Sequence, residues 1–364
     1  MRAIVLVGGE GTRMRPLTYT TPKPLLPVCN QAFVDHQLTW LASHGVDEVV
    51  LSLGYLPDAF VDHFPEGRYA GVDLRYAVEA DPLGTAGAIR FAAGDQRERF
   101  VVCNGDVLTD LDLGALVRLH EESGAEATIA LTRVDDPSRF GVVPTDPDGR
   151  VLAFVEKPEP GRAPSDWINA GTYVLEASML DRIPRGVNTS IERVTFPRML
   201  ESGGRLYARR SDAYWLDVGV PAQYVQAHLD LLAGLVGGMT PPGAHELAPG
   251  VWTQGEVDLH PDAVVHPPVL LGAGARVESG ATVRRSSLAA GTAVASGAVV
   301  EGSVMLTGAM LESGARVADS VLGPGSTVGR SASVSELSVV GAGAAVEAGA
   351  TLAGVRIDPV GHRS

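Results

Sequence analysis

The chain lacks the cysteine content of a disulfide-stapled or zinc-binding protein. Its 364 residues include two cysteines, Cys29 and Cys103, which lie far apart and show no CxxC spacing. A disulfide framework or a structural zinc site usually needs more cysteines at closer spacing, so we expect neither. We expect the two thiols to be small residues that line the core.

Long apolar runs and an excess of positive charge are also missing. No stretch reaches the roughly 18 apolar residues of a membrane span, and strand-like residues begin at Ala3 behind a single Arg2, where no signal peptide fits. The formal net charge is −14. Nucleic acids and anionic membranes need clustered cations, so neither is an expected partner, whereas a few local cations and Mg²⁺ still suffice for a nucleotide. The chain is expected to be soluble and cytoplasmic.

Up to about residue 232 the chain alternates strand-like and helical segments. This alternation predicts a Rossmann-like, mostly parallel α/β sheet with helices on both faces, whose ligands lie outside the carboxyl ends of the strands. The length favours a second domain as well. The expected strands are residues 3–7, 48–53, 73–78, 100–103 and 128–134, and the expected helices are 33–44, 87–93 and 113–123.

Beyond about Gly234 the pattern changes to a short repeat. Aliphatic residues recur every six positions with glycine, alanine or serine between them, and each turn holds 17 or 18 residues. This pattern predicts a C-terminal left-handed parallel β-helix of about five coils, because helix propensity does not explain a period of six with glycine in every coil. The predicted divisions are a domain over 1–232, a linker over 233–250, the β-helix over 251–356 and a tail over 357–364. The repeated residues are Leu271, Val277, Val283; Leu288, Val294, Val300; Met305, Leu311, Val317; Leu322, Val328, Val334; and Val340, Val346, Leu352.

The first expected strand runs directly into a glycine-rich turn, Gly8-Gly9-Glu10-Gly11-Thr12-Arg13. Such a turn exposes consecutive backbone N–H groups that can cradle phosphate, and Arg13 and Lys23 follow within reach of one loop. Neither the dinucleotide pattern GxGxxG with its immediate helix nor the Walker pattern GxxxxGK[ST] fits. The turn predicts a polyphosphate site, with a glycine turn between solvated arginines as the alternative.

Residues 8–27, GGEGTRMRPLTYTTPKPLLP, resemble the GGxGTRxxPLTxxxPKP signature of sugar-1-phosphate nucleotidyltransferases. The later segments EADPLGTAG, NTSIERVTFP and YWLDVG resemble the mannose-1-phosphate guanylyltransferase branch. The resemblance implies attack by a sugar-1-phosphate oxygen on the α-phosphorus of a nucleoside triphosphate, with release of pyrophosphate. Such displacements require alignment and charge neutralisation more than covalent chemistry.

The resemblance also implies which residues hold the nucleotide and the metal. Two aspartates that hold Mg²⁺ in the family match Asp106 and Asp217, and two carboxylates suffice because Mg²⁺ completes its octahedron with water and phosphate. Arg13 and Lys23 are placed to neutralise the triphosphate, and both carry a catalytic role with Asp106. The nucleotide-binding positions are Leu6, Gly8, Gly9, Gly11, Thr12, Arg13, Lys23, Glu79, Pro82, Gly84, Thr85, Asn104, Gly105 and Asp106.

The sugar-phosphate side comes from two later segments. In the family the EKP lysine contacts the sugar phosphate and its glutamate contacts sugar hydroxyls, which implies Lys157 as a catalytic cation and Glu156 as a residue that binds the sugar. Asn169 and Gly171 resemble the segment that lines the hexose, and Gly141 the backbone that approaches it. Without the resemblance, Glu156-Lys157 is only an exposed ion pair before a proline turn.

Glu79 bears on the choice of base. Uridylyl and thymidylyl relatives usually carry glutamine at this place, whose amide can pair with a pyrimidine imide. A carboxylate can accept from guanine N1–H and the N2 amine together and repels the carbonyl oxygens of uracil or thymine. We therefore expect GTP as the nucleotide, with an exposed acid of no such role as the alternative.

Three other interpretations remain. The same chemistry could use UTP or dTTP, or the 1-phosphate of another sugar or a cyclitol. A non-catalytic regulatory subunit should have lost part of these motifs, all of which are present. An acetyltransferase activity of the β-helix is disfavoured, because His260 and His266 lie at the entrance to the repeat and the coils show no loop insertion.

A prism face of small side chains predicts a homo-oligomer.

Overall fold

The computed structural model describes residues 1–362 and divides into two compact units. Unit 1 comprises Met1–Glu10 and Val34–Trp215, and unit 2 comprises Gly11–Phe33 and Leu216–Ser364. Residues 11–33, within the first predicted domain, are thus grouped with the C-terminal half of the chain. The predicted boundaries at residues 232 and 250 divide the chain into consecutive segments, whereas the two units are groups of residues in contact. The predicted boundaries therefore stay a prediction. Residues 363 and 364 of the predicted tail lie outside the described residues.

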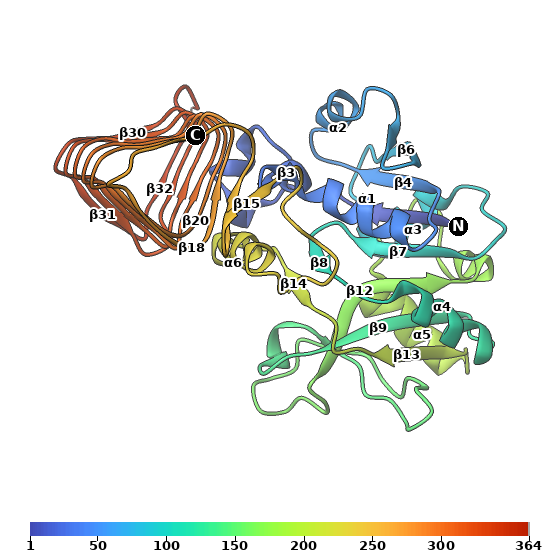
Figure 1. Ribbon diagram of the computed structural model, residues 1–364. Helices are drawn as coiled ribbons and strands as arrows, with labels where there is room; N and C mark the ends of the chain where they lie inside the picture. The colour runs from blue at the N-terminus through green and yellow to red at the C-terminus, as the bar shows by residue number, and fades with distance from the viewer. Residues whose placement is uncertain (363–364) are drawn as a thin grey trace. The chain divides into compact units, whose positions relative to one another are not determined.

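Unit 1 is built on a mixed sheet with the predicted parallel core. The order β11-β10-β12-β7-β1-β4-β6-β5 places β7, β1, β4 and β6 side by side and parallel, while β9 joins β12 to β13 (Figure 1). The five expected strands are confirmed to within a residue or two. The strands are β1 (Arg2–Leu6), β4 (Glu48–Leu53), β5 (Arg68–Tyr69), β6 (Val72–Val78), β7 (Phe100–Asn104), β8 (Val107–Thr109), β9 (Ala127–Arg133), β10 (Gly141–Val142), β11 (Val155–Glu156), β12 (Trp167–Leu175) and β13 (Leu206–Arg210).

Six strands of unit 1 were not predicted from the sequence, and the longest of them is β12. It runs antiparallel to β7 and β9, with a register shift between Asn169 and Tyr173. Gly171, inside this shift, has φ +72°. A glycine at positive φ and a bulge remove the regular alternation that marks a strand in sequence, and no strand was predicted for this segment.

Helices cover both faces of this sheet. One core cluster joins Ile89 of α3 and Phe196 of α5 to Ile4, Val102 and Tyr173 on the strands. The buried residues of α4 lie outside that cluster although α4 packs on β9, β12 and β13, so α4 covers the other face. The helices are α1 (Phe33–Ser43), α2 (Asp58–His63), α3 (Gly84–Ala93), α4 (Leu113–Glu122) and α5 (Phe196–Glu201), with short helical turns at Pro137–Arg139, Ala177–Arg182 and Ile191–Thr195.

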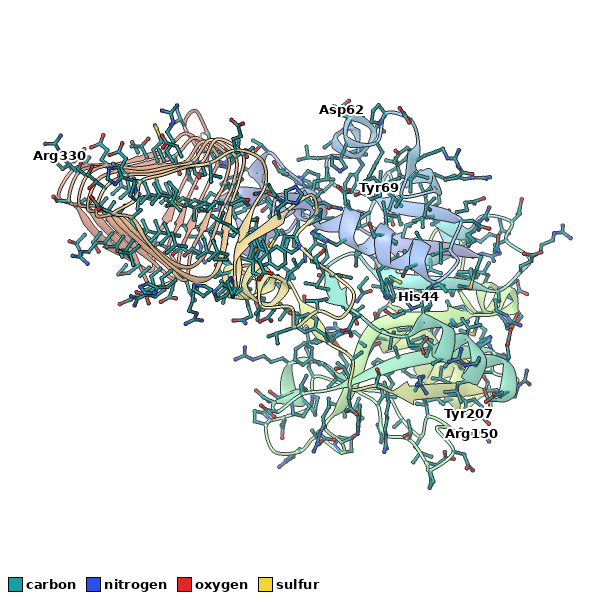
Figure 2. All side chains as sticks on the ribbon, viewed as in Figure 1. His44, Asp62, Tyr69, Arg150, Tyr207 and Arg330 are labelled. Atoms are coloured by element: carbon teal, nitrogen blue, oxygen red, sulfur yellow. The ribbon has the colours of Figure 1, made fainter. Side chains whose placement is uncertain are left out.

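The turn between β10 and β11 closes back onto the sheet. Arg150 forms an isolated antiparallel bridge with Tyr207 of β13, and the two side chains lie together at one edge of the unit (Figure 2). The N–H of Val151 donates to the carbonyl of Leu206 at 2.9 Å. This edge therefore holds the segment that leads into Glu156 and Lys157.

Unit 2 contains the predicted β-helix, whose coils are stacked in Figure 1. The registers place Leu271 over Leu288, Met305, Leu322 and Val340, which confirms one predicted column; the columns that begin at Val277 and Val283 are confirmed in the same way. The strands are β16 (Val251–Thr253), β17 (Asp258–Leu259), β18 (Val264–Leu271), β19 (Arg276–Val277), β20 (Thr282–Leu288), β21 (Ala293–Val294), β22 (Val299–Glu301), β23 (Val304–Met305), β24 (Met310–Leu311), β25 (Arg316–Ala318), β26 (Val321–Leu322), β27 (Thr327–Val328), β28 (Ser333–Ser335), β29 (Val339–Val340), β30 (Ala345–Val346), β31 (Thr351–Ala353) and β32 (Arg356–Ile357).

One outer face of the β-helix is covered. Leu270, Val304, Val321 and Val339 alternate with the inward columns and so point outward, yet each is at most 1% exposed. Helix α6 (Pro221–Leu232) packs on β18 and β20 and also contacts β2. The other elements of unit 2 are the turns η1 (Thr12–Met14), η2 (Leu17–Tyr19) and η3 (Lys23–Leu25), and the strands β2 (Pro27–Val28), β3 (Gln31–Ala32) and β15 (His245–Ala248); β14 (Trp215–Asp217) begins at the last residue of unit 1.

Both cysteines are buried, as expected. Burial raises the pKa of the Cys29 thiol above its ordinary range and that of Cys103 to about 12. Neutral thiols in these places act as small apolar groups. Among residues 1–362, no helix has the length and apolar character needed to cross a membrane.

Candidate active site

The predicted site residues are divided between the two units. Unit 1 holds the glycines that end β1, the Asn104–Asp106 turn, the expected base segment and the expected sugar-phosphate residues. Unit 2 holds Gly11, Thr12, Arg13, Lys23 and Asp217.

The carboxyl end of β1 is packed so closely that only glycine fits beside it. The N–H of Gly105 donates to the carbonyl of Leu6 at 2.9 Å, and a Cβ on Gly105 would collide with the side chain of Val7. A Cβ on Gly54, at the end of β4, would lie 2.8 Å from the carbonyl oxygen of Gly8. A Cβ on Gly9 would meet nothing within 4 Å, so the backbone there is open to a ligand. The sequence predicted Gly8, Gly9 and Gly105 but gave no signal for Gly54.

The turn that carries Asp106 rests on a buried glutamine of α1. Gln37, 5% exposed, donates from Nε2 to the carbonyl oxygens of Asn104 at 2.8 Å and Val107 at 2.9 Å. A Cβ on Gly171 would lie 2.6 Å from Asn104 Nδ2, so the predicted nucleotide and hexose segments touch at this point. Sequence reasoning missed Gln37, because a single amide on an apolar helix carries no motif.

Replacing Gln37 with leucine is expected to raise the Mg²⁺ concentration for half-maximal turnover about tenfold. The substitution removes both donors that hold the two ends of the Asp106 turn, and supporting residues of metal ligands are typically worth about 10–100-fold. Titration of turnover with Mg²⁺ measures the effect. The matched control is Gln96→Leu, at the amino ends of the strands, where Gln96 bonds Arg2 and Glu98. An unchanged Mg²⁺ dependence of Gln37→Leu contradicts the prediction.

The expected base segment is ordered by Glu79 itself. Its carboxylate accepts from the Ser52 hydroxyl at 3.1 Å and from the Leu83 N–H at 2.9 Å. The carbonyl of Pro82 accepts from Asn188 Nδ2 at 2.8 Å. Glu79 is half-buried, and its two hydrogen bonds hold the loop together. An ionised carboxylate has about four acceptor sites, so lone pairs remain for a bound base.

Glu192 joins the base segment to the hexose segment. Its carboxylate accepts from Thr85 Oγ1 at 2.7 Å and from the Tyr173 hydroxyl at 3.4 Å. Asn169 Nδ2 donates to the Tyr173 oxygen at 2.7 Å, and Asn169 Oδ1 accepts from the Gly171 N–H at 3.0 Å. Burial, followed by the Glu192 charge, keeps the pKa of Tyr173 well above its ordinary value, so the phenol stays a neutral donor.

Glu192 had only a weak signal in the sequence. It lies within NTSIERVTFP, one of the segments that carried the resemblance, but no role was assigned to it. In the structure it lies in a π-helical turn, Ile191–Thr195, a rare conformation that occurs frequently at functional sites.

Glu156 and Lys157 lie in a tight and unusual stretch of backbone. Lys157 has φ +49°, costly for a residue with a Cβ, and its N–H donates to the carbonyl of Phe140 at 2.9 Å. Glu156 accepts from Arg193 Nη2 at 3.3 Å, and its Oε2 would lie 3.0 Å from a Cβ on Gly141. The Lys157 ammonium lies 3.9 Å from Glu156, with its side chain 57% exposed. Glu156 and Lys157 thus have structural contacts beyond the exposed ion pair that the sequence alone suggested. Arg193 is a second cation beside Glu156 and was not predicted.

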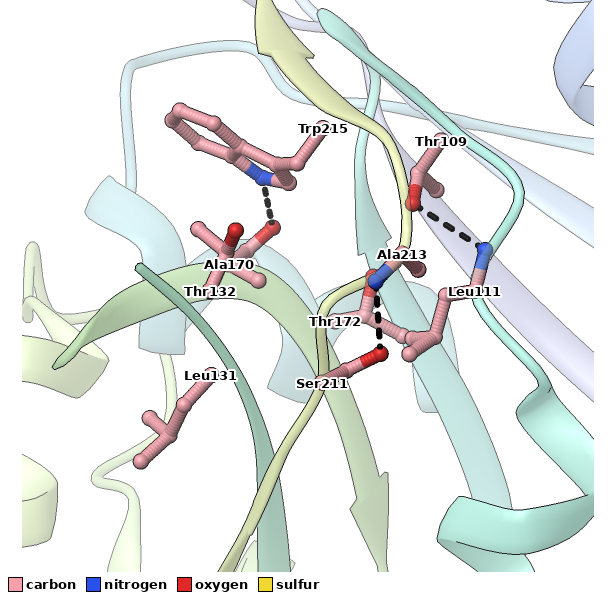
Figure 3. Close-up of a pocket in the computed structure, with 9 residues that line it drawn as sticks. All are labelled: Thr109, Leu111, Leu131, Thr132, Ala170, Thr172, Ser211, Ala213 and Trp215. Atoms are coloured by element: carbon pink, nitrogen blue, oxygen red, sulfur yellow. Dashed lines mark hydrogen bonds between the residues drawn. The ribbon is translucent and has the colours of Figure 1, made fainter. Parts of the chain in front are cut away.

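A small cavity lies beside the hexose segment (Figure 3). Its volume is about 10 Å³, enough for one water molecule and too small for a nucleotide or a sugar. The Trp215 indole N–H donates to the carbonyl of Ala170 at 2.9 Å across it. Trp215 therefore fixes the backbone next to Asn169 and Gly171. The lining residues are Thr109, Leu111, Leu131, Thr132, Ala170, Thr172, Ser211, Ala213 and Trp215.

Within unit 2, Arg13 and Asp217 meet at one glycine. A Cβ on Gly219 would lie 2.9 Å from Arg13 Nη2 and 3.1 Å from Asp217 Oδ1. Gly11 has φ +62°, and a Cβ there would lie 3.1 Å from the Cβ of Lys23. The structure thus brings Gly11 and Lys23 together, and Arg13 and Asp217 together.

The described residues contain no group of three or more histidine, cysteine, aspartate or glutamate side chains arranged for a metal. The predicted ligands are two carboxylates, one in each unit. Oxygen donors of this kind suit Mg²⁺, which needs only one or two protein carboxylates when phosphate and water supply the rest.

The chain resembles known proteins over most of its length. The nucleotidyl transferase family matches residues 2–234, and the family described as GMPPB C-terminal domain matches residues 265–362. Mannose-1-phosphate guanylyltransferase of Mycobacterium tuberculosis is 41% identical over 283 residues, 77% of this chain and 76% of that protein. UTP–glucose-1-phosphate uridylyltransferase of Synechocystis is 35% identical over 298 residues, 78% of this chain and 76% of that protein.

A solved structure shares the fold of the N-terminal part. The crystal structure of HddC from Yersinia pseudotuberculosis complexed with GMP-PN has a TM-score of 0.54 and 29% sequence identity, and the match covers 62% of this chain and 97% of that one. The family match extends over well more than half of the residues, and the relatives are covered over about three quarters of their own length. This chain belongs to the nucleotidyl transferase family.

Proposed function

We propose that the protein is a mannose-1-phosphate guanylyltransferase, which joins mannose 1-phosphate to GTP and releases pyrophosphate. The observation that carries the proposal is the Glu192 network, because it joins the base segment at Thr85 to the hexose segment at Asn169 within one unit. The substrates are inferred from the guanylyltransferase relatives, with up to 41% identity. Self-association through the β-helix and a cytoplasmic location stay predictions from the sequence.

In this proposal, different residues bind the triphosphate of the nucleotide and the phosphate of the sugar. The open backbone at Gly9 and the cations Arg13 and Lys23 bind the triphosphate, and Lys157 binds the sugar phosphate. The two substrates are both anionic, so cations on each are needed before an oxygen of one can approach the phosphorus of the other. Mg²⁺ held by Asp106 and Asp217 would supply further charge neutralisation on the triphosphate.

Turnover measured over a grid of nucleotides and sugar 1-phosphates tests the proposal. GTP with mannose 1-phosphate is expected to give the highest kcat/KM for pyrophosphate release. A higher kcat/KM for UTP or dTTP, or for another sugar or cyclitol phosphate, would show that the protein catalyses the same reaction on different substrates. No release of pyrophosphate from any pair identifies a non-catalytic regulatory subunit instead.

Glu79→Gln is expected to lower kcat/KM for GTP about tenfold and to raise the UTP-to-GTP ratio. The glutamine oxygen can still accept one of the two loop hydrogen bonds, but its NH₂ group faces the guanine donors where a carboxylate oxygen would accept. The control is Asp81→Asn, an exposed acid on the same loop. A UTP-to-GTP ratio equal to that of the unmodified enzyme excludes a role of Glu79 in base choice.

A further inference from the structure

The segment of residues 11–33, called the signature loop from here on, is folded onto itself. The Thr18 hydroxyl donates to the carbonyl of Gly11 at 2.8 Å, and the Met14 N–H donates to the same oxygen at 2.8 Å. A Cβ on Gly11 would lie 3.1 Å from Thr18 Cγ2 and 3.1 Å from Lys23 Cβ. Gly11, Thr18 and Lys23 form one packed group, so a displacement at Thr18 displaces the other two.

The later part of the signature loop is held by α6 and β16. The Tyr224 hydroxyl donates to the carbonyl of Pro27, and the Cys29 N–H donates to His228 Nδ1 at 3.2 Å. Gln254 Nε2, just after β16, donates to the carbonyl of Cys29 at 3.2 Å. These bonds hold residues 27–29, and the turn η2 (Leu17–Tyr19) lies earlier in the signature loop, between Arg15 and Lys23.

Turn η2 is supported from the other end of the chain. The imidazole of His362 stacks on the ring of Tyr19, with centroids 3.7 Å apart and planes 26° from parallel. The guanidinium carbon of Arg15 lies 5.2 Å from the centroid of the same ring. Ring stacking and cation–π contacts both attract beyond the area that they bury.

The tail that presents His362 is itself fixed to the last coil of the β-helix. Ile357 of β32 is in register with Val340 of β29. The Val360 N–H donates to the carbonyl of Ala342 at 3.1 Å, and the His362 N–H donates to that of Pro359 at 3.1 Å. The imidazole is therefore attached to a regular scaffold and not to a free end.

We infer that His362 is a positioning residue of the nucleotide site. Its ring holds Tyr19, Tyr19 holds the adjacent Thr18, and Thr18 holds Gly11 and Lys23 where the proposed triphosphate binds. The inference rests on the proposed function for the identity of the ligand, whereas the contacts that support it lie entirely within unit 2. It gives the β-helix a role in catalysis through the last residues of the chain.

The test compares His362→Ala and His362→Phe in the full-length protein. His362→Ala is expected to raise KM for GTP about threefold to tenfold and to leave KM for mannose 1-phosphate within about twofold, because one stacked ring pair is lost and only the nucleotide side is affected. His362→Phe is expected to restore KM for GTP, since stacking needs a flat ring and no titratable nitrogen. His266→Ala, an exposed histidine of β18, is the matched control.

Hydrogen exchange of the ligand-free protein provides a readout that does not depend on activity. Amides of residues 12–26 are expected to exchange faster in His362→Ala than in the unmodified protein and in His362→Phe. Unchanged exchange in that segment, an unchanged KM for GTP, or a failure of phenylalanine to restore either, overturns the inference. If no substrate pair is turned over but exchange responds as expected, the proposed function fails while the support of the signature loop by His362 stands.

Discussion

Asp106→Asn and Asp217→Asn are each expected to lower Mg²⁺-dependent turnover about 10²–10³-fold. Asparagine keeps the size of the side chain and removes the charge, so the loss measures the carboxylate as a metal ligand. A loss of this size is comparable to that of one transition-state donor in other enzymes. Pyrophosphate release at saturating GTP and mannose 1-phosphate, repeated over a range of Mg²⁺ concentrations, measures it.

Two exposed aspartates serve as controls in this experiment. Asp148 lies on a surface turn of unit 1, and Asp258 lies on β17 of unit 2. The control variants are Asp148→Asn and Asp258→Asn. Both are expected to keep turnover within about twofold, as surface changes usually do. Because Arg13 and Asp217 flank Gly219, the Asp217 variant is also compared at high GTP. If excess GTP restores Asp217→Asn but excess Mg²⁺ does not, Asp217 orients Arg13 and is not a ligand.

Lys23→Arg and Lys157→Arg are expected to lower kcat/KM about 10–100-fold although both keep the charge. Of the 29 lysine and arginine residues in the chain, Lys23 and Lys157 are the only lysines. A chain that otherwise uses arginine for every cation has kept the compact ammonium at the two places where a phosphate is expected. A guanidinium is larger, planar and set further from the backbone, and a shift of about 1 Å at a reacting group can cost about 10²-fold. Arg150→Lys, on a surface turn, is the control and is expected to have no effect.

The same scarcity of lysine permits a direct assignment of each phosphate. Within residues 1–364 an amine-selective reagent has two lysine side chains to modify, Lys23 and Lys157, and peptide mass spectrometry separates the two. GTP with Mg²⁺ is expected to protect Lys23, and mannose 1-phosphate is expected to protect Lys157, whose side chain is 57% exposed. Protection in the reverse order exchanges the two roles, and no protection of either lysine contradicts both.

Regular patterns in the sequence predicted the regular parts of the fold. The strand Glu48–Leu53 and the β-helix columns, such as Leu271 over Leu288, occur where apolar periodicity placed them. These elements follow local rules, because a buried strand or a stacked coil repeats the same requirement at fixed spacing. By contrast, β12 was missed, since a bulge and Gly171 at positive φ interrupt its pattern.

The site shows the same division. Motifs predicted Gly105 and Lys157, whereas the contacts of Gln37 and Glu192 are with partners that are distant in the sequence. A lone glutamine on an apolar helix carries no pattern, and its importance arises only when two carbonyl oxygens from another loop lie against it. The burial of Val304 and Val321, which point outward from their coils, likewise could not be predicted from the periodicity of the repeat.

The sequence by itself determined the two kinds of architecture, the glycine turn and the residues that the family resemblance singled out. These depend on short-range spacing, which a linear chain displays directly. Only the tertiary structure decided that residues 11–33 belong with the C-terminal half and that Tyr19 stacks on His362. Contacts across more than 300 residues depend on where the whole backbone returns, and no local pattern records that. The signature loop, which carries the clearest motif in the sequence, is therefore supported by His362, in a segment for which the sequence predicted only a tail.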